Sequence, residues 1–251
     1  MKALNHSQIW IALMAAIGSF GIGHKGDWLY MAWVFCLTLF VYNAYRWLKL
    51  ITGNYNHQRP DHAWSIQHIK WHQLVTVLSF IVSCSMVFWI NPIMLINIGL
   101  GLLFLFVYIC LVFGLKDMPL NTYLNSVFKA LILAITWSLV VLPPIDLHQF
   151  NMQWPKITYV GLLLFGLAMS FEIRDQTNIK HLLLVISILS LFVACSLQCY
   201  FNSKHLVDVL AFYVFAIVLI IRQSKHTQTE HYAWPIDGLI GLYGLLNIWI
   251  I

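Results

Sequence analysis

The residues best suited to chemistry lie at the end of one long apolar segment, in 170–178 (Ser-Phe-Glu-Ile-Arg-Asp-Gln-Thr-Asn). Glu172 and Asp175 are three positions apart, so they would share one face of a helix. Two carboxylates at this spacing can bind a divalent cation, which would in turn hold phosphate oxygens. The guanidinium group of Arg174 can bind phosphate directly. A salt-bridge network at a helix end is the alternative interpretation of this pattern.

Three further polar residues interrupt or border apolar sequence. Asn43 and Arg46 lie in 41–47 (Val-Tyr-Asn-Ala-Tyr-Arg-Trp), at the end of the second apolar segment. Asn43 is a candidate metal or hydrogen-bond ligand and Arg46 a candidate phosphate contact, although an ordinary membrane-surface belt of aromatic and basic residues is also consistent with the segment. Lys129 begins the fifth segment, where it would either face lipid headgroups or neutralise an anion in a cavity.

Histidines and cysteines give weaker signals. His68 and His72 have the spacing of a helical metal pair, but no further ligand is evident, and we interpret the histidines of this connection as solvated or interfacial. The histidines lie at the edges of the apolar segments, which argues against a haem protein. All five cysteines lie in apolar segments, so we expect small buried hydrophobes and neither a disulfide framework nor a zinc site.

The composition requires a membrane environment for these groups. Hydrophobic residues make up 61% of the chain and charged residues 9%, against about 25% charged residues in soluble domains. Long apolar blocks in lipid must form helices of roughly 20 residues. We expect a single domain over 1–251, an all-α bundle with nine helices near 7–23, 28–46, 73–91, 93–114, 126–143, 157–172, 181–201, 205–222 and 233–251.

The distribution of basic residues predicts the orientation of these helices. A cytoplasmic N-terminus places most lysines and arginines in cytoplasmic loops and leaves only Lys25, Lys156 and Lys204 outside, as the positive-inside rule requires. The longest connection, from about Arg46 to His72, would then be cytoplasmic. The net charge of +5 is spread through the loops without a basic run, so nothing indicates nucleic-acid binding.

Nine predicted spans with polar motifs at the cytoplasmic ends of the second and sixth resemble the UbiA superfamily of intramembrane prenyltransferases, and most closely its divergent Bacteroidetes members. Three stretches carry the resemblance. Residues 42–46 (Tyr-Asn-Ala-Tyr-Arg) look like the subfamily's Tyr-Asn-Phe-Asp-Arg, residues 128–143 are similar to its Leu-Lys…Trp…Leu-Pro segment, and residues 171–175 (Phe-Glu-Ile-Arg-Asp) are similar to Phe-Asp-Ile-Arg-Asp. Asp237 and Gly238 in the last span add a smaller likeness.

The resemblance implies a bacterial inner-membrane enzyme that transfers a prenyl group from an isoprenyl diphosphate to a lipophilic acceptor. In that family Mg²⁺ ions held by two aspartate-rich motifs neutralise the leaving diphosphate. Carried over to this chain, Asn43 represents the first motif, and Glu172 and Asp175 the second. Lys129, with Arg46 or Arg174, would contact the diphosphate.

The chain also departs from the family pattern. The acidic positions behind Asn43 are filled by Ala44, Tyr45 and Trp47, and an aspartate expected after Asp175 is replaced by Ile179. A UbiA-like protein without catalysis, which binds membrane lipid or serves as a structural subunit of a membrane-protein complex, is therefore the main alternative. A small transporter or channel is a third class.

Overall fold

The structure, a computed structural model, describes residues 8–53, 60–114, 122–143, 150–175, 179–225 and 233–250. Within these residues 92% of positions are helical and no strand is present. The all-α prediction is confirmed to this extent. The chain divides into two compact units at the Asn91–Pro92 pair, and the last helix, α11, returns to the first unit. Proline suits the first position of a helix because its missing N–H has no intrahelical partner there.

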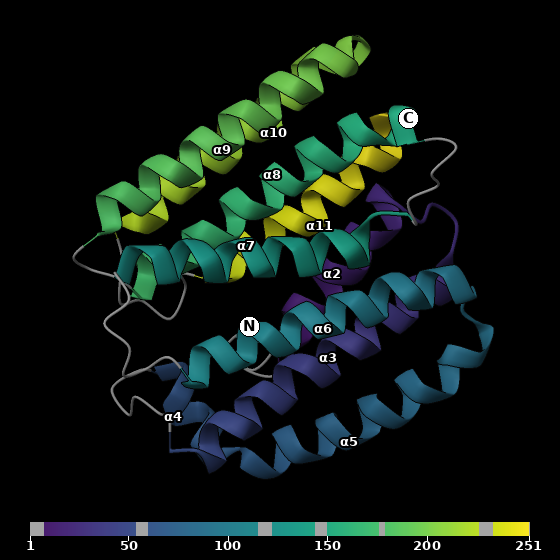
Figure 1. Cartoon of the computed structure of the whole chain (residues 1–251), viewed down its shortest axis with the longest axis vertical. Helices are drawn as coiled ribbons and strands as arrows, with labels where there is room; N and C mark the ends of the chain where they lie inside the picture. Colours follow the sequence, from purple (N-terminus) through teal and green to yellow (C-terminus); the bar gives the residue numbers. More distant parts are fainter. Residues whose placement is uncertain are drawn as a thin grey trace. The chain divides into compact units, whose positions relative to one another are not determined.

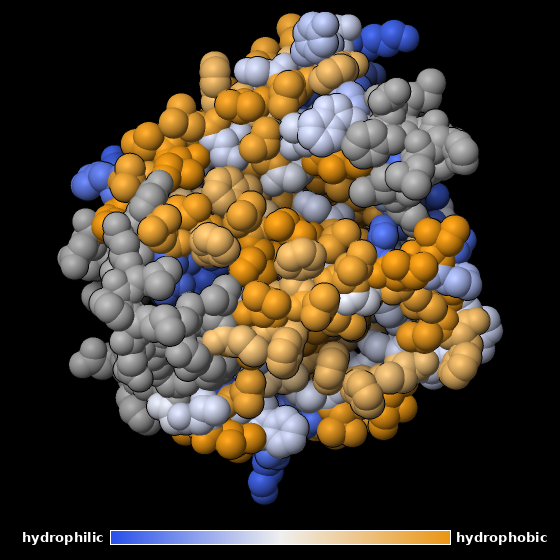
Figure 2. Space-filling model, viewed as in Figure 1, coloured by the Kyte–Doolittle hydropathy of each residue, from blue (hydrophilic) through white to orange (hydrophobic). Residues whose placement is uncertain are grey.

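Seven helical segments in the described residues are long and apolar enough to cross a membrane, and two shorter apolar helices cover Ile9–Ile22 and Pro235–Ile248. Large hydrophobic side chains are exposed along most of these helices, and hydrophobic residues make up most of the described surface drawn in Figure 2. Exposed apolar surface of this extent is unfavourable in water and suits lipid. The chain is therefore a multi-pass membrane protein, while the count of nine spans stays a prediction.

The first unit is built around helix α3 (Trp28–Ile51), which packs on both α2 (Ile9–Ile22) and α5 (Ile69–Met86). The remaining elements of this unit are the short helix α4 (Pro60–Gln67), the 3₁₀ turn η1 (Val87–Trp89) and α11 (Ala233–Ile250) (Figure 1). Asp27 caps the start of α3, where its Oδ1 accepts a hydrogen bond from the Tyr30 backbone N–H at 2.8 Å. Such caps satisfy one of the free N–H groups at a helix start.

Helices α2 and α11 approach each other through glycines. A side chain at Gly21 would collide with the backbone of Gly244, and a Cβ on Gly18 would lie 2.8 Å from Cγ2 of Ile240. Small residues allow close backbone approach between helices, which is a common way to pack them in membranes. Lys25 adds a bond at one end of this pair, because its Nζ donates to the backbone oxygen of Asn247 at 2.7 Å.

The second unit is a series of helices in which each packs on the next along the chain. They are α6 (Pro92–Gly114), α7 (Thr122–Val141), α8 (Phe150–Asp175), α9 (Lys180–Phe201), the turn η3 (Ser203–His205) and α10 (Leu206–Ser224). Polar contacts join α8 to α9, because Ser187 Oγ donates to the Gly166 backbone oxygen and Ser190 Oγ to that of Leu162, both at 2.7 Å.

A helix lies at every predicted apolar block, but two helices are clearly longer than their blocks. Helix α3 continues to Ile51 and α8 begins at Phe150, because a helix can extend beyond the apolar stretch that hydropathy detects. The expected long connection from Arg46 to His72 is largely helical in its described part, since α3, α4 and α5 occupy most of it.

Candidate functional site

Asn43, the representative of the first predicted motif, is fully buried on α3. Its Nδ2 donates to the Leu39 backbone oxygen one turn earlier at 2.8 Å. Its Oδ1 lies 2.7 Å from Nδ1 of His72 on α5. The amide therefore links two helices of the first unit, and its role as a metal ligand stays a prediction.

The environment of Asn43 assigns the protonation of His72. Because Asn43 Nδ2 is the donor to Leu39, Oδ1 is the atom that faces the imidazole, and His72 Nδ1 must carry the hydrogen. A ring protonated on both nitrogens would bury a charged N–H without an acceptor, which is the more costly arrangement. His72 is thus neutral, with its lone pair on Nε2.

His72 is fully buried, so the interpretation of the histidines as solvated is wrong for this residue, while its position relative to the membrane interface stays a prediction. His72, Thr76, Ser79 and Ser83 are the buried residues of α5, and their spacing places them on one face of the helix. Thr76 Oγ1 donates to the His72 backbone oxygen at 2.6 Å. The sequence contains this periodic polar face, which sequence reasoning missed because it considered only the pair of His68 and His72.

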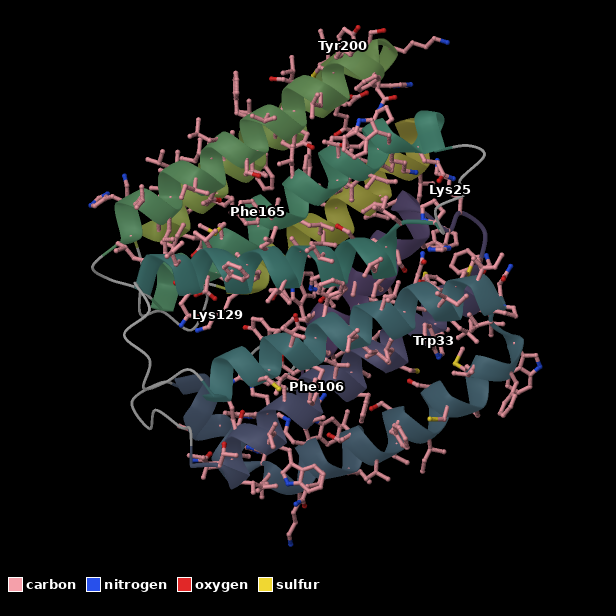
Figure 3. The ribbon with its side chains drawn as sticks, in the orientation of Figure 1. Lys25, Trp33, Phe106, Lys129, Phe165 and Tyr200 are labelled. Carbon is pink, nitrogen blue, oxygen red and sulfur yellow. The ribbon has the colours of Figure 1, made fainter. Side chains whose placement is uncertain are left out.

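This polar face is held against α3 at both ends. At one end is the Asn43–His72 bond, and at the other Trp33 Nε1 donates to the backbone oxygen of Ser83 at 2.9 Å. Trp33 is buried on α3 and is labelled in Figure 3. Polar contacts between helices are typical of membrane proteins, where lipid offers no other partner.

Aromatic and basic groups surround the His72 end of α5. The Trp64 ring of α4 is perpendicular to the His72 ring, with centroids 5.6 Å apart, and stacks on His68 at 4.2 Å. Arg46, predicted to contact phosphate, is half-buried on α3 and is one of the ionisable groups close enough to act electrostatically on His72. The first unit therefore brings Asn43 and Arg46 to one end of the α3–α5 pair.

The other predicted site residues belong to the second unit. Lys129 lies on α7 and Glu172 on α8, and both side chains are half-buried. Helix α8 remains helical through Arg174 and Asp175, whose side chains lie outside the described part of the structure. Glu172 and Asp175 thus keep the predicted helical spacing.

The register between α7 and α8 places Lys129 near this motif. Ser138 of α7 packs on Gly161 of α8, with its Oγ 3.8 Å from where a Cβ would lie. The two helices run in opposite directions. Lys129 precedes Ser138 on α7 by as many residues as Ser170 follows Gly161 on α8. Lys129 and Ser170 are therefore expected at the same height along the helix pair. From this register we infer that Lys129, which is labelled in Figure 3, lies at the level of the 170–175 segment.

The predicted site residues thus form two groups, one in each unit. Asn43 and Arg46 lie on α3 in the first unit, and Lys129 and Glu172 lie on α7 and α8 in the second. The prediction that these residues act together rests on the sequence alone. Among the described residues no three His, Cys, Asp or Glu side chains are placed to hold one metal ion. No family model, curated protein or solved structure matches the chain.

Proposed function

We propose that the chain is a divergent UbiA-like prenyltransferase of the bacterial inner membrane. It transfers a prenyl group from an isoprenyl diphosphate to a lipophilic acceptor at the cytoplasmic side. The observation that carries the proposal is the end of α8, which stays helical through Glu172 and Asp175. The inferred register between α7 and α8 supports the proposal by bringing Lys129 toward this end. A pair of carboxylates with a nearby cation suits a metal-bound diphosphate.

The donor set fits one Mg²⁺ ion better than two. Mg²⁺ is usually bound by one or two carboxylates together with substrate phosphates, which Glu172 and Asp175 would supply. The first motif offers no carboxylate, and the Asn43 oxygen is already bonded to His72. We therefore assign the ion to Glu172 and Asp175 alone.

The basic residues complete the proposed mechanism. Glu172 and Asp175 would hold the Mg²⁺ ion, which would supply positive charge against the leaving diphosphate. Lys129 and Arg174 bind the diphosphate oxygens and stabilise the charge that develops as the allylic C–O bond breaks. Arg46 belongs to the first unit and stays a candidate phosphate contact that rests on the sequence alone. The apolar surfaces of the helices accommodate the prenyl chain and the acceptor.

A second candidate function is favoured by the Asn43–His72 bond. In this function the chain binds lipid or supports a membrane-protein complex without catalysis. The bond uses the Asn43 side chain to hold α3 against α5. A UbiA-like protein that has lost the reaction would still retain such a packing contact. Both candidates share the membrane fold and differ in whether diphosphate is released.

The experiment that separates these functions uses protein in lipid nanodiscs with radiolabelled farnesyl diphosphate, Mg²⁺ and a mixture of lipophilic phenols and quinone precursors. We expect a labelled lipid product and free diphosphate from the wild type, and neither from Asp175→Ala. The matched control is Asp208→Ala, because the Asp208 side chain is exposed. Among the described residues, the ion pair of Asp208 is with Nδ1 of His205 at 3.7 Å. Wild-type protein that binds the label and forms no product would favour the second candidate.

A further inference from the structure

One end of the α3–α5 pair carries a concentration of positive charge. Helices α3 and α5 contain no acidic residue, and their lysines and arginines all lie near the end where α3 finishes and α5 begins, at Arg46, Lys49 and Lys70. The Asn43–His72 bond joins the two helices at this same end. We propose that Arg46 and Lys49 bind the phosphate headgroup of an anionic phospholipid there.

The acidic residues of the first unit do not balance this charge. Lys25 and Asp27 lie together at the opposite end of α3, and Asp237 is buried on α11. The undescribed side chains of this unit add no net charge, because they comprise two basic and two acidic residues, Lys2, Arg59, Asp61 and Glu230. An anionic headgroup is complementary to the basic cluster that remains at the shared end of α3 and α5.

Arg46 and Lys49 are placed to act on one headgroup. They are three positions apart, so they share one face of α3. Both side chains are half-buried, and long basic side chains of this kind cover apolar surface with their stems while their charged ends reach the polar layer. The Nζ of Lys49 lies 4.6 Å from the centroid of the Tyr45 ring, a cation–π contact that holds the ammonium group beside the helix. A guanidinium and an ammonium group on one face suit a single phosphate group.

The two helices place these charges at a membrane surface. Helices α3 and α5 each belong to a segment that is long and apolar enough to cross a membrane, and charge within the hydrocarbon layer is costly. Exposed apolar side chains border the charged end on both helices, namely Leu48, Ile51, Trp71 and Leu74. A phospholipid reaches the two cations from the lipid phase, with its acyl chains along these residues, and needs no cavity within the protein.

Lys70 lies at the same end of the pair but on a different face. It comes two positions before His72 in α5, which is about half a turn of an α-helix. It therefore lies on the side of α5 away from the contact with Asn43, and its side chain is exposed. Because Lys70 carries the same charge near the same membrane surface, Lys70→Gln is the matched control for a site made by Arg46 and Lys49.

The test measures the binding of dioleoyl phosphatidylglycerol and dioleoyl phosphatidylcholine to the full chain in neutral detergent by native mass spectrometry. The two lipids have the same acyl chains, but only phosphatidylglycerol has a net negative charge. We expect the wild type to bind phosphatidylglycerol about tenfold more tightly. We expect Lys49→Gln to reduce this preference to about threefold, and the double variant Arg46→Gln/Lys49→Gln to abolish it. The preference should persist in Lys70→Gln.

Three results would overturn the inference. Equal binding of the two lipids to the wild type would show that the end of α3 has no headgroup site, and this result needs no variant to fold. An equal loss of preference in Lys70→Gln and Lys49→Gln would indicate general attraction to a basic surface. Displacement of phosphatidylglycerol by inorganic phosphate would indicate a site for the free anion.

The inference stands under either candidate function, because the probes carry no diphosphate and no Mg²⁺ is added. A phospholipid on Arg46 leaves Lys129 and Arg174 as the proposed diphosphate contacts. A chain that prefers phosphatidylglycerol and does not bind farnesyl diphosphate would keep this inference and lose the proposed prenyl transfer.

Discussion

Nδ1 of His72 lies 2.7 Å from Oδ1 of Asn43. The two residues are 29 positions apart in sequence, and their contact joins helix α5 to helix α3. Both side chains are fully buried. The contact pairs the amide oxygen of Asn43 with Nδ1 of His72, which lowers the cost of burying these two polar atoms in an apolar chain. The same hydrogen bond also favours one packing register of α5 on α3.

The first prediction concerns the strength of this contact. Asn43→Leu leaves the His72 N–H without an acceptor, so we expect the free energy of unfolding to fall by about 1–3 kcal/mol. A double-mutant cycle with His72→Phe, measured by reversible unfolding in mixed micelles, should give a coupling energy of about 1 kcal/mol.

Ser196→Ala is the control for this cycle, because Ser196 is exposed and bonds only within its own helix among the contacts described here. We expect a change within about 0.5 kcal/mol for this variant. Additive effects of Asn43→Leu and His72→Phe would show that the two residues do not act as a pair.

The apolar blocks predicted every long helix because lipid requires both apolar side chains and internal backbone bonds. They did not predict the short helix α4, which lies in the expected connection between the second and third blocks. They did not predict the extent of α8, whose start at Phe150 includes the polar residues Asn151, Gln153 and Lys156. Hydropathy reports preference for lipid, whereas the backbone remains helical as long as its own hydrogen bonds are kept.

The second prediction concerns the glycine contact between α2 and α11. Gly21→Ala introduces a methyl group that collides with the Gly244 backbone, so we expect a loss of about 1–3 kcal/mol of stability. Gly99→Ala, on α6, is the matched control because no atom lies within 4 Å of its added Cβ. We expect this control to be neutral or to gain up to about 1 kcal/mol. Equal thermal stability of both variants would contradict the close approach of α2 and α11.

The third prediction concerns orientation. With a cytoplasmic N-terminus, the exposed residues Thr52 and Lys204 lie on opposite sides of the membrane. A membrane-impermeant maleimide should label Lys204→Cys in intact cells and Thr52→Cys only after permeabilisation. The unaltered chain, whose cysteines lie in apolar helices, provides the background. The reverse pattern of labelling would invert the proposed topology and move the candidate site to the outer side.

The fourth prediction concerns Lys129 and the diphosphate. Lys129→Met removes a charge at the level of the α8 motif and keeps the aliphatic stem, so we expect about tenfold weaker binding of farnesyl diphosphate. Lys204→Met, at an exposed lysine in the same unit, should leave the affinity unchanged. Scintillation proximity measurements on both variants check this expectation, and equal affinities would remove Lys129 from the site.

The sequence predicted the candidate site residues only in part. Asn43 was identified as a polar group at a helix end, but its partner was not, because His72 becomes buried only when α5 packs on α3. Burial of a polar side chain depends on which distant helix it meets, and a single sequence does not contain that pairing. The end of α8 was easier to recognise, because Glu172 and Asp175 are close in sequence.

The most direct test of the proposed function is the equilibrium binding of farnesyl diphosphate to the purified chain, first with Mg²⁺ and then with a chelator. We predict binding that requires Mg²⁺, is lost in Asp175→Ala and is kept in the control Asp208→Ala. Absence of binding to the wild type under both conditions would contradict a diphosphate site at the end of α8, and with it the assignment as a prenyltransferase.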